Sequence, residues 1–257
     1  MLSLAISPCP NDTFIFAAMA SRPDRYRLTL DDVEALNQGA EREAFDVVKI
    51  SAAAYGRIAP HYALLRAGGA AGFGVGPLLV AASPREPGGR IAIPGERTTA
   101  ARLLRLLGDF ETVSMRFDRI EAAVLAGEVD CGVIIHEGRF TYADKGLTKL
   151  ADLGDVWEQQ MRSPLPLGAI AIRRTLGPDV ARQVDEDIRA SLRASWAAPA
   201  SVMPFVREHA QEMAPAVVQQ HIDLYVNDYS LNLDEAAIEK LLGLDTSRTP
   251  ALPTFAY

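Results

Sequence analysis

The 257-residue chain has only two cysteines, Cys9 and Cys131, and no cluster of metal-ligating residues accompanies either of them. Neither a disulfide framework nor a zinc site is therefore indicated, and a reducing compartment fits best. Long apolar runs are also missing, since none approaches the ~20 residues that span a bilayer, and the N-terminus carries no basic residue before its short apolar run. These absences predict a cytoplasmic protein with no membrane segment and no metal.

Positively charged residues are in the minority: the chain has 26 Lys and Arg and 33 Asp and Glu, which gives a net charge of −7. Nucleic acid and anionic membranes would on average be repelled and are not expected partners. No internal repeat is found, which excludes array architectures. Hydrophobic residues make up 49% of the chain, which is enough to form the core of one large domain or of two modest ones.

Short β-branched or apolar runs alternate with longer segments of helical period, which predicts an α/β protein with a largely parallel sheet. Strands are predicted at Leu2–Ile6, Val47–Ile50, Leu78–Ala82, Arg90–Ile93, Thr112–Met115, Cys131–Ile135 and Ala169–Ile172. Helices are predicted to begin at Asn11 or Asp12, Ser51, Thr98 and Asp118, whose side-chain oxygens can cap free amides.

Two turn-forming segments, 83–89 and 176–178, break this alternation and indicate crossings between two lobes. After the second crossing the chain is almost entirely helical and must pack on an existing sheet. Those helices are predicted at Asp179–Ala198, Ala200–Glu212, Ala216–Tyr225 and Asp234–Leu242. Lobe one therefore comprises residues 1–83 plus 176–257 and lobe two residues 84–175, with a ligand-binding cleft between them.

The loop Ser7–Phe14 follows the first strand directly, and its two prolines predict a rigid, polar turn that exposes Asn11 and Asp12 to the cleft. A tight strand-to-helix turn without a binding role explains the same residues equally well. Cys9 has no basic neighbour in the sequence, so a packed thiol is favoured over a nucleophile.

Two strand ends are predicted to hold an anionic group. At the first, Lys49 supplies charge and Ser51 a hydroxyl at a helix start, although a solvated lysine and an ordinary cap are an alternative. At the second, hydroxyls precede a helix whose first free amides belong to Thr99 and Ala100, an arrangement suited to a carboxylate, or to a plain cap. No P-loop is present, so a nucleoside triphosphate is not expected.

His136 stands at the end of a buried apolar strand, next to the predicted cleft, with Glu137 and Arg139 close behind it. An imidazole with a pKa near ~6.5 exchanges protons at neutral pH, which predicts an acid–base role; a hydrogen-bonded structural histidine is the alternative. Three other histidines are interpreted as structural or solvated, because none has metal-site spacing. They are His61, His209 and His221.

Seven segments together resemble the 1,4-dihydroxy-6-naphthoate synthases. They are SPCPNDTFIF at Ser7–Phe16, VKIS at Val48–Ser51, RAGGAAGFGVGPLLV at Arg66–Val80, PGERTTA at Pro94–Ala100, GVIIHEGRFTY at Gly132–Tyr142, PLPLGAI at Pro164–Ile170 and YVNDYSLNL at Tyr225–Leu233. The resemblance implies a two-lobed type II periplasmic-binding-protein-like fold with a central cleft. It also implies a carbon–carbon lyase that makes 1,4-dihydroxy-6-naphthoate and dihydroxyacetone from cyclic dehypoxanthinyl futalosine in the futalosine route of menaquinone biosynthesis, with no cofactor or metal.

Carried over by residue, the resemblance implies that His136 is the proton acceptor. A small anionic aromatic substrate would be held by the segments Lys49–Ser51 and Thr99–Ala100. The implied binding residues are Lys49, Ile50, Ser51, Thr99 and Ala100, with Asn11, Asp12, Thr98 and Arg139 as further cleft residues. Gly138 departs from the family, in which many members carry a polar side chain there. A solute-binding module without catalysis and the sister chorismate dehydratase are the alternatives.

Overall fold

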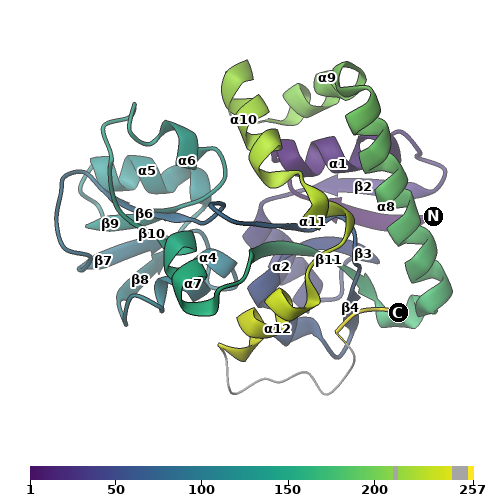
Figure 1. The fold of residues 1–257 in the computed structure, drawn as a ribbon, viewed down its shortest axis with the longest axis horizontal. Helices are drawn as coiled ribbons and strands as arrows, with labels where there is room; N and C mark the ends of the chain where they lie inside the picture. Colours follow the sequence, from purple (N-terminus) through teal and green to yellow (C-terminus); the bar gives the residue numbers. More distant parts are fainter. Residues whose placement is uncertain (211–213, 245–253) are drawn as a thin grey trace.

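The computed structural model describes residues 1–210, 214–244 and 254–257, which form two α/β lobes, each built on its own sheet (Figure 1). The larger lobe holds a six-stranded sheet in the order β2-β1-β3-β11-β4, with β5 paired to β11. Its strands are β1 (Leu2–Ile6), β2 (Tyr26–Leu30), β3 (Val47–Ser51), β4 (Tyr62–Leu64), β5 (Ala70–Gly72) and β11 (Leu165–Arg173).

The smaller lobe holds a five-stranded sheet in the order β10-β6-β9-β7-β8. Its strands are β6 (Leu78–Ala81), β7 (Arg90–Ile93), β8 (Glu111–Ser114), β9 (Cys131–Ile134) and β10 (Thr148–Asp152). Each strand predicted from the sequence is present, within a residue or two at most ends; β11 is longer than predicted. The prediction of a largely parallel arrangement is wrong, because β11 runs antiparallel to β3, β4 and β5, and β6 runs antiparallel to β9 and β10.

The predicted lobe boundaries also need correction, although one lobe is indeed inserted into the other. Strand β5 lies in the larger sheet and β6 in the smaller one, so the chain crosses at residues 73–77. It returns between α7 (Leu153–Met161) and β11, at residues 162–164. The predicted crossing at 83–89 instead connects β6 and β7 of the same sheet, because turn chemistry marks a turn without showing which sheet the next strand joins.

Helices cover both lobes. The larger lobe carries α1 (Pro10–Ala20), α2 (Val33–Glu41), α3 (Tyr55–Ile58), α8 (Gly177–Ala197), α9 (Pro199–His209), α10 (Pro215–Tyr225), α11 (Asp228–Leu231) and α12 (Glu235–Gly243). The smaller lobe carries α4 (Thr99–Leu104), α5 (Phe117–Leu125), α6 (Gly138–Thr141) and α7. The C-terminal helices pack on the larger lobe, as predicted. The predicted helix Ala200–Glu212 is observed as α9, and its last two residues lie outside the described ones.

The helix α1 is the central helix of the larger lobe. Pro10 occupies its first turn, where the missing amide hydrogen would be unused in any case. Its apolar side chains form one core with α8, and two hydroxyls of α8 add direct bonds to its backbone: Ser191 Oγ donates to the Ile15 carbonyl (2.6 Å) and Ser195 Oγ to the Phe14 carbonyl (2.7 Å). The polar start of α1 is therefore held rigidly at the junction of the lobes.

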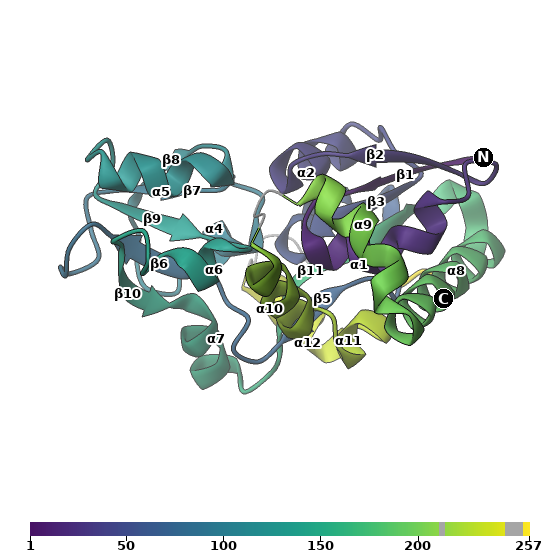
Figure 2. The same ribbon diagram turned by 90° about the horizontal axis from the view of Figure 1, so that it is seen from above.

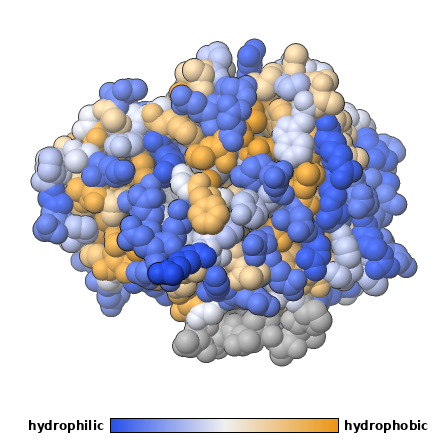
Figure 3. Space-filling view, in the orientation of Figure 1, coloured by the Kyte–Doolittle hydropathy of each residue, from blue (hydrophilic) through white to orange (hydrophobic). Residues whose placement is uncertain are grey.

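Figure 2 shows α10 at this junction, with its end toward α6 of the smaller lobe, and the two helices are in contact. Figure 3 shows the face of Figure 1 in space-filling form, with hydrophilic and hydrophobic residues mixed across it. Among the described residues, none of the helices combines the length and the apolar character needed to cross a membrane.

Candidate active site

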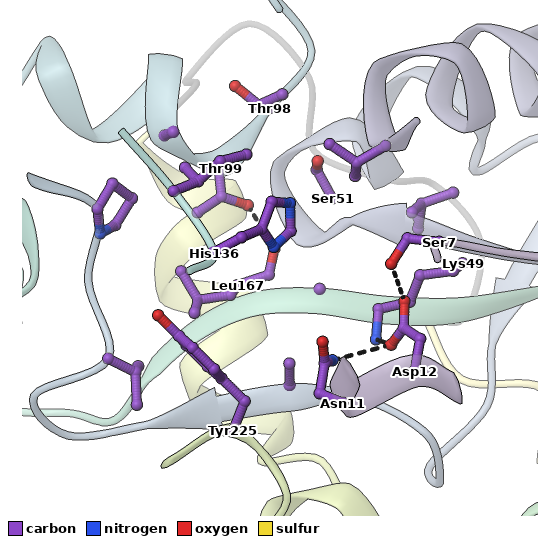
Figure 4. Close-up of a pocket in the computed structure, with 18 of the residues that line it drawn as sticks. Ser7, Asn11, Asp12, Lys49, Ser51, Thr98, Thr99, His136, Leu167 and Tyr225 are labelled. Atoms are coloured by element: carbon purple, nitrogen blue, oxygen red, sulfur yellow. Dashed lines mark hydrogen bonds and ion pairs between the residues drawn. The ribbon is translucent and has the colours of Figure 1, made fainter. Parts of the chain in front are cut away.

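A cavity of about 90 Å³, partly open to solvent, lies between the lobes. The structure places every predicted site residue around it except Arg139 (Figure 4). The larger lobe contributes Ser7, Asn11, Asp12, Lys49, Ile50 and Ser51, the smaller lobe contributes Thr98, Thr99, Ala100 and His136, and α10 contributes His221 and Tyr225. The cavity thus draws on segments that are far apart in the sequence.

Lys49 does not offer a free charge to the cavity, which corrects the role expected from the sequence. Its Nζ lies 2.6 Å from Asp12 Oδ1 and donates to the Gly68 carbonyl at 3.1 Å. Asp12 also accepts from Ser7 Oγ (2.6 Å) and from Asn11 Nδ2 (2.9 Å). Both members of the pair are at least 94% buried, so Asp12 already balances the ammonium charge. Lys49 therefore organises the polar wall of the cavity.

Ser51 ends β3 and is followed only by a three-residue 3₁₀ helix, which its side chain does not cap. Instead, its backbone amide donates to Asn37 Oδ1 (2.8 Å) and its hydroxyl oxygen accepts from Asn37 Nδ2 (3.1 Å). The hydroxyl hydrogen stays available for a ligand, because the oxygen is used as an acceptor. The predicted hydroxyl is thus in the cavity wall, but held by Asn37 on α2 rather than by a helix start.

Thr98 caps α4 as predicted: its Oγ1 accepts from the Ala101 amide (3.1 Å) and donates to the Gly95 carbonyl (2.7 Å). This cap does not use the amides of Thr99 and Ala100. The Thr99 hydroxyl has a different function from the one expected, since it donates to the Leu167 carbonyl (2.8 Å) and accepts from the Ala53 amide (3.2 Å). Both partners belong to the larger lobe, so this hydroxyl joins the lobes.

A second contact joins the lobes beside α4. Arg97 Nη1 lies 2.9 Å from Glu34 Oε1, and Arg97 Nη2 lies 2.9 Å from Glu41 Oε2. Both carboxylates are on α2 of the larger lobe, whereas Arg97 precedes α4 of the smaller lobe. We call this set of three residues the interlobe clasp. Together with Thr99, it holds the cleft in a closed arrangement.

His136 follows β9 with a backbone φ of +56°, a conformation that is uncommon for residues other than glycine and is often found at functional sites. Its Nδ1 lies 3.4 Å from Cys9 Sγ, and its ring packs edge-on against Phe117. Its Nε2 is buried and has no hydrogen-bond partner. Burial lowers the pKa of His136 to about 4, so the ring is neutral at pH 7 and one nitrogen holds a free lone pair.

Cys9 has the basic neighbour that the sequence did not reveal, because His136 is 127 residues away along the chain. Burial raises the pKa of the Cys9 thiol well above its usual value, and the Glu137 carboxylate raises it further. Since the pKa of His136 is lowered at the same time, a thiolate–imidazolium pair does not form. The thiol packs against the ring as a neutral hydrogen-bonding group.

Arg139 does not reach the cavity, so its predicted place among the cleft residues is wrong. Its Nη1 donates to the Gly76 carbonyl (2.6 Å), and its Nη2 lies 2.8 Å from Asp152 Oδ2. Asp152 in turn caps α7 through the Gly154 amide. The guanidinium therefore ties α6 to the crossing segment and to α7.

Sequence reasoning missed His221, which was interpreted as structural or solvated. It is 1% exposed and lies in the cavity wall, where its Nε2 is 2.9 Å from Asn11 Oδ1. Its ring lies 6.2 Å from that of His136 and 4.6 Å from that of Tyr225. The spacing of His221 and Tyr225, one helical turn apart on α10, was the available signal, because it puts both rings on one face.

Within residues 1–210, 214–244 and 254–257, no group of three or more His, Cys, Asp or Glu side chains is arranged to hold a metal ion.

The architecture is the periplasmic-binding-protein fold, which confirms the predicted fold class. The periplasmic aliphatic sulphonate-binding protein of Escherichia coli matches with a TM-score of 0.67 at 10% identity, over 96% of this chain and 86% of that one. A far closer match is a crystal structure of a protein from Archaeoglobus fulgidus, with a TM-score of 0.91 at 38% identity over 96% and 97% of the two chains.

A protein-family model described as menaquinone biosynthesis matches residues 2–245. Two relatives named 1,4-dihydroxy-6-naphthoate synthase come from Thermus thermophilus, 43% identical over 98% of this chain and 97% of the relative, and from Streptomyces coelicolor, 44% identical over 95% and 92%. The chain therefore belongs to the menaquinone biosynthesis family, among its 1,4-dihydroxy-6-naphthoate synthases, and is an enzyme.

Proposed function

We propose that this enzyme converts cyclic dehypoxanthinyl futalosine to 1,4-dihydroxy-6-naphthoate and dihydroxyacetone, with His136 as the proton acceptor. The observation that supports this role is the buried Nε2 of a neutral imidazole, which lacks a partner in the wall of the interlobe cavity. A base needs a free lone pair within reach of the substrate, and Nε2 supplies one in the tautomer in which Nδ1 donates its hydrogen to Cys9 Sγ. The proposal places the reaction in the futalosine route of menaquinone biosynthesis, in the cytoplasm.

The walls suit an aromatic carboxylate. Apolar side chains cover much of the cavity, and the polar groups are few and localised. The Ser51 hydroxyl and the amides at the start of α4 are donors that can face a carboxylate, and a carboxylate beside α4 benefits from the helix dipole. The ring would then lie between the lobes, with its sugar-derived portion extending toward the histidines.

Closure of the lobes and substrate charge both act on His136. The Thr99 bonds and the interlobe clasp keep the cleft closed, which excludes water and fixes the substrate against the imidazole. A negatively charged substrate would raise the pKa of the ring from the low value that burial gives it, because nearby negative charge favours the protonated form. The base thereby becomes better matched to neutral pH when the substrate is present.

The test is product formation by the purified chain from cyclic dehypoxanthinyl futalosine, followed by mass spectrometry. We expect wild-type turnover, and a loss of about 10²–10⁴-fold in kcat for His136→Asn, the usual contribution of a positioned base. The exposed His61, changed to Gln, is the matched control and should keep wild-type turnover. Wild-type kcat in folded His136→Asn would reject the assigned base.

Two further experiments test the alternative functions, a chorismate dehydratase and a solute-binding module. Chorismate is supplied in place of the futalosine derivative, and its dehydration would favour the sister enzyme. A thermal shift with the futalosine derivative but no product would instead indicate a solute-binding module. We expect neither result.

A further inference from the structure

His221 is a buried histidine in which one ring nitrogen has a hydrogen-bond partner and the other has none. Its Nε2 is 2.9 Å from Asn11 Oδ1, whereas its Nδ1 is buried without a hydrogen-bond partner. Buried polar atoms are nearly always paired, so an orphaned nitrogen in a cavity wall needs an explanation. Because α10 covers the junction of the lobes, the ring is in position to meet whatever occupies the cavity (Figure 2).

The contacts of Asn11 determine which nitrogen of His221 carries the proton. Asn11 Nδ2 donates to Asp12 Oδ1 at 2.9 Å, so the oxygen of the same amide faces His221. An amide oxygen only accepts hydrogen bonds, and His221 Nε2 must therefore be the protonated nitrogen. Its Nδ1 then carries a lone pair and no hydrogen. Burial is the main cause that lowers the pKa of His221 well below its usual value, and electrostatic coupling to His136 and then to Lys49 adds to it, so a second proton is not added.

This tautomer is rigidly supported. Asp12 is fixed by Ser7 and Lys49, Asn11 is fixed by Asp12, and Asn11 in turn orients His221; Figure 4 shows the first part of this network around Asp12. Every member is at most 7% exposed. A network with this much burial positions a side chain precisely enough for recognition of a ligand group.

We propose that His221 is a second substrate-contacting residue, whose Nδ1 accepts a hydrogen bond from a hydroxyl of the sugar-derived, departing part of the substrate. This inference rests on the proposed function. A neutral nitrogen with a lone pair attracts a hydrogen-bond donor and repels carboxylate or carbonyl oxygen, so a hydroxyl is the partner that fits. His221 then orients the portion of the substrate that leaves, next to His136 at a ring separation of 6.2 Å.

The test compares two substitutions in the same turnover assay. His221→Phe keeps the ring and its packing against Tyr225 but has no nitrogen, and we expect its kcat/KM to fall about 10–100-fold, the loss of a buried hydrogen bond to a ligand. His221→Gln keeps one donor and one acceptor and should recover part of that loss. His61→Gln serves as the control histidine and should match the wild type. The affinity of His221→Phe for 1,4-dihydroxy-6-naphthoate should stay within about threefold, because the product lacks the departing part.

A second measurement keeps His221 itself unchanged, so its result does not depend on whether the His221 variants fold. In ¹⁵N-histidine spectra of His136→Asn, which retains His221, the unprotonated Nδ1 resonance of His221 should move upfield when cyclic dehypoxanthinyl futalosine binds. A static resonance in the bound state, or wild-type kcat/KM in folded His221→Phe, would overturn the role of His221. Failure of the wild-type chain to form product would instead refute the proposed function, and with it this inference.

Discussion

The Sγ of Cys9 lies 3.4 Å from Nδ1 of His136, although the two residues belong to different lobes. Cys9 precedes α1 of the larger lobe, and His136 follows β9 of the smaller one. The thiol can therefore hold the imidazole only when the lobes are closed. Closure of the cleft and orientation of the proposed base are therefore coupled. The base would be correctly oriented only once the substrate is enclosed.

Replacing Cys9 distinguishes a neighbour of the base from a nucleophile. Because the thiol stays protonated, we expect Cys9→Ser to retain kcat within about threefold and Cys9→Ala to lose about tenfold through a less well oriented ring. Removing a true nucleophile would lower kcat by as much as ~10⁶-fold. Steady-state turnover of the two variants, with circular dichroism as the folding control, decides between these roles.

Breaking the interlobe clasp should weaken substrate binding more than chemistry. Arg97→Ala removes two partly exposed ion pairs that join the lobes, so we expect KM to rise about 5–30-fold while kcat changes little. Arg90→Ala is the matched control, since Arg90 pairs with Glu111 within the smaller lobe in an exposed position. An unchanged KM for Arg97→Ala, or an equal rise for Arg90→Ala, would contradict the clasp.

The pH dependence of activity should reflect a base with an unusually low pKa. Since the pKa of His136 is lowered to about 4, kcat/KM should persist well below pH 6.5 and fall only as the pH approaches 4. A profile measured between pH 4 and 8 checks this, within the range in which the protein stays folded. A decline centred near 6.5 would mean that the free enzyme's ring is solvated rather than buried.

The same shift predicts how stability changes with pH. In the unfolded chain His136 takes up a proton near its ordinary value of ~6.5, whereas the folded ring resists protonation down to about 4. The unfolded state thus binds more protons in this window, and the free energy of unfolding falls as the pH drops from 6.5 toward 4. His221 contributes with the same sign. Urea unfolding at pH 7 and 5 checks this. Between these two pH values the free energy of unfolding should fall less for His136→Asn than for the wild type.

Gly138, which the sequence analysis singled out, is not among the residues that line the cavity. A Cβ added there would lie 3.0 Å from Glu121 Oε1, a buried oxygen without a partner. We expect Gly138→Asn to raise the free energy of unfolding by about 0.5–1.5 kcal/mol beyond Gly138→Ala, because its amide can donate to that oxygen. Turnover should change less than threefold, as is roughly expected for a group outside the cavity. A large change in kcat would show that this position acts on the base after all.

Much of the architecture could be predicted from local patterns. The strands at Leu2–Ile6, Arg90–Ile93 and Cys131–Ile134 follow from short apolar runs, since a buried strand needs little else. The cap at Thr98 follows from a hydroxyl before a helix. Strand direction could not be obtained this way, because apolar composition carries no information about which way β6 and β11 run. The prediction of the lobe boundaries was wrong for a related reason. Nothing in the residues of the crossing segment 73–77 distinguishes it from a loop within one lobe.

The amino-acid sequence by itself determined the fold class, the family and the polar segments that line the cleft, because each depends on residue types read in order along the chain. Only the tertiary structure decided how those groups are used. It paired Lys49 with Asp12, tied Arg139 to Asp152, placed Cys9 against His136, and brought His221 to Asn11. These are contacts between distant segments, and packing and desolvation in the folded state, rather than sequence neighbours, determine which charges are balanced and which nitrogen atoms remain free.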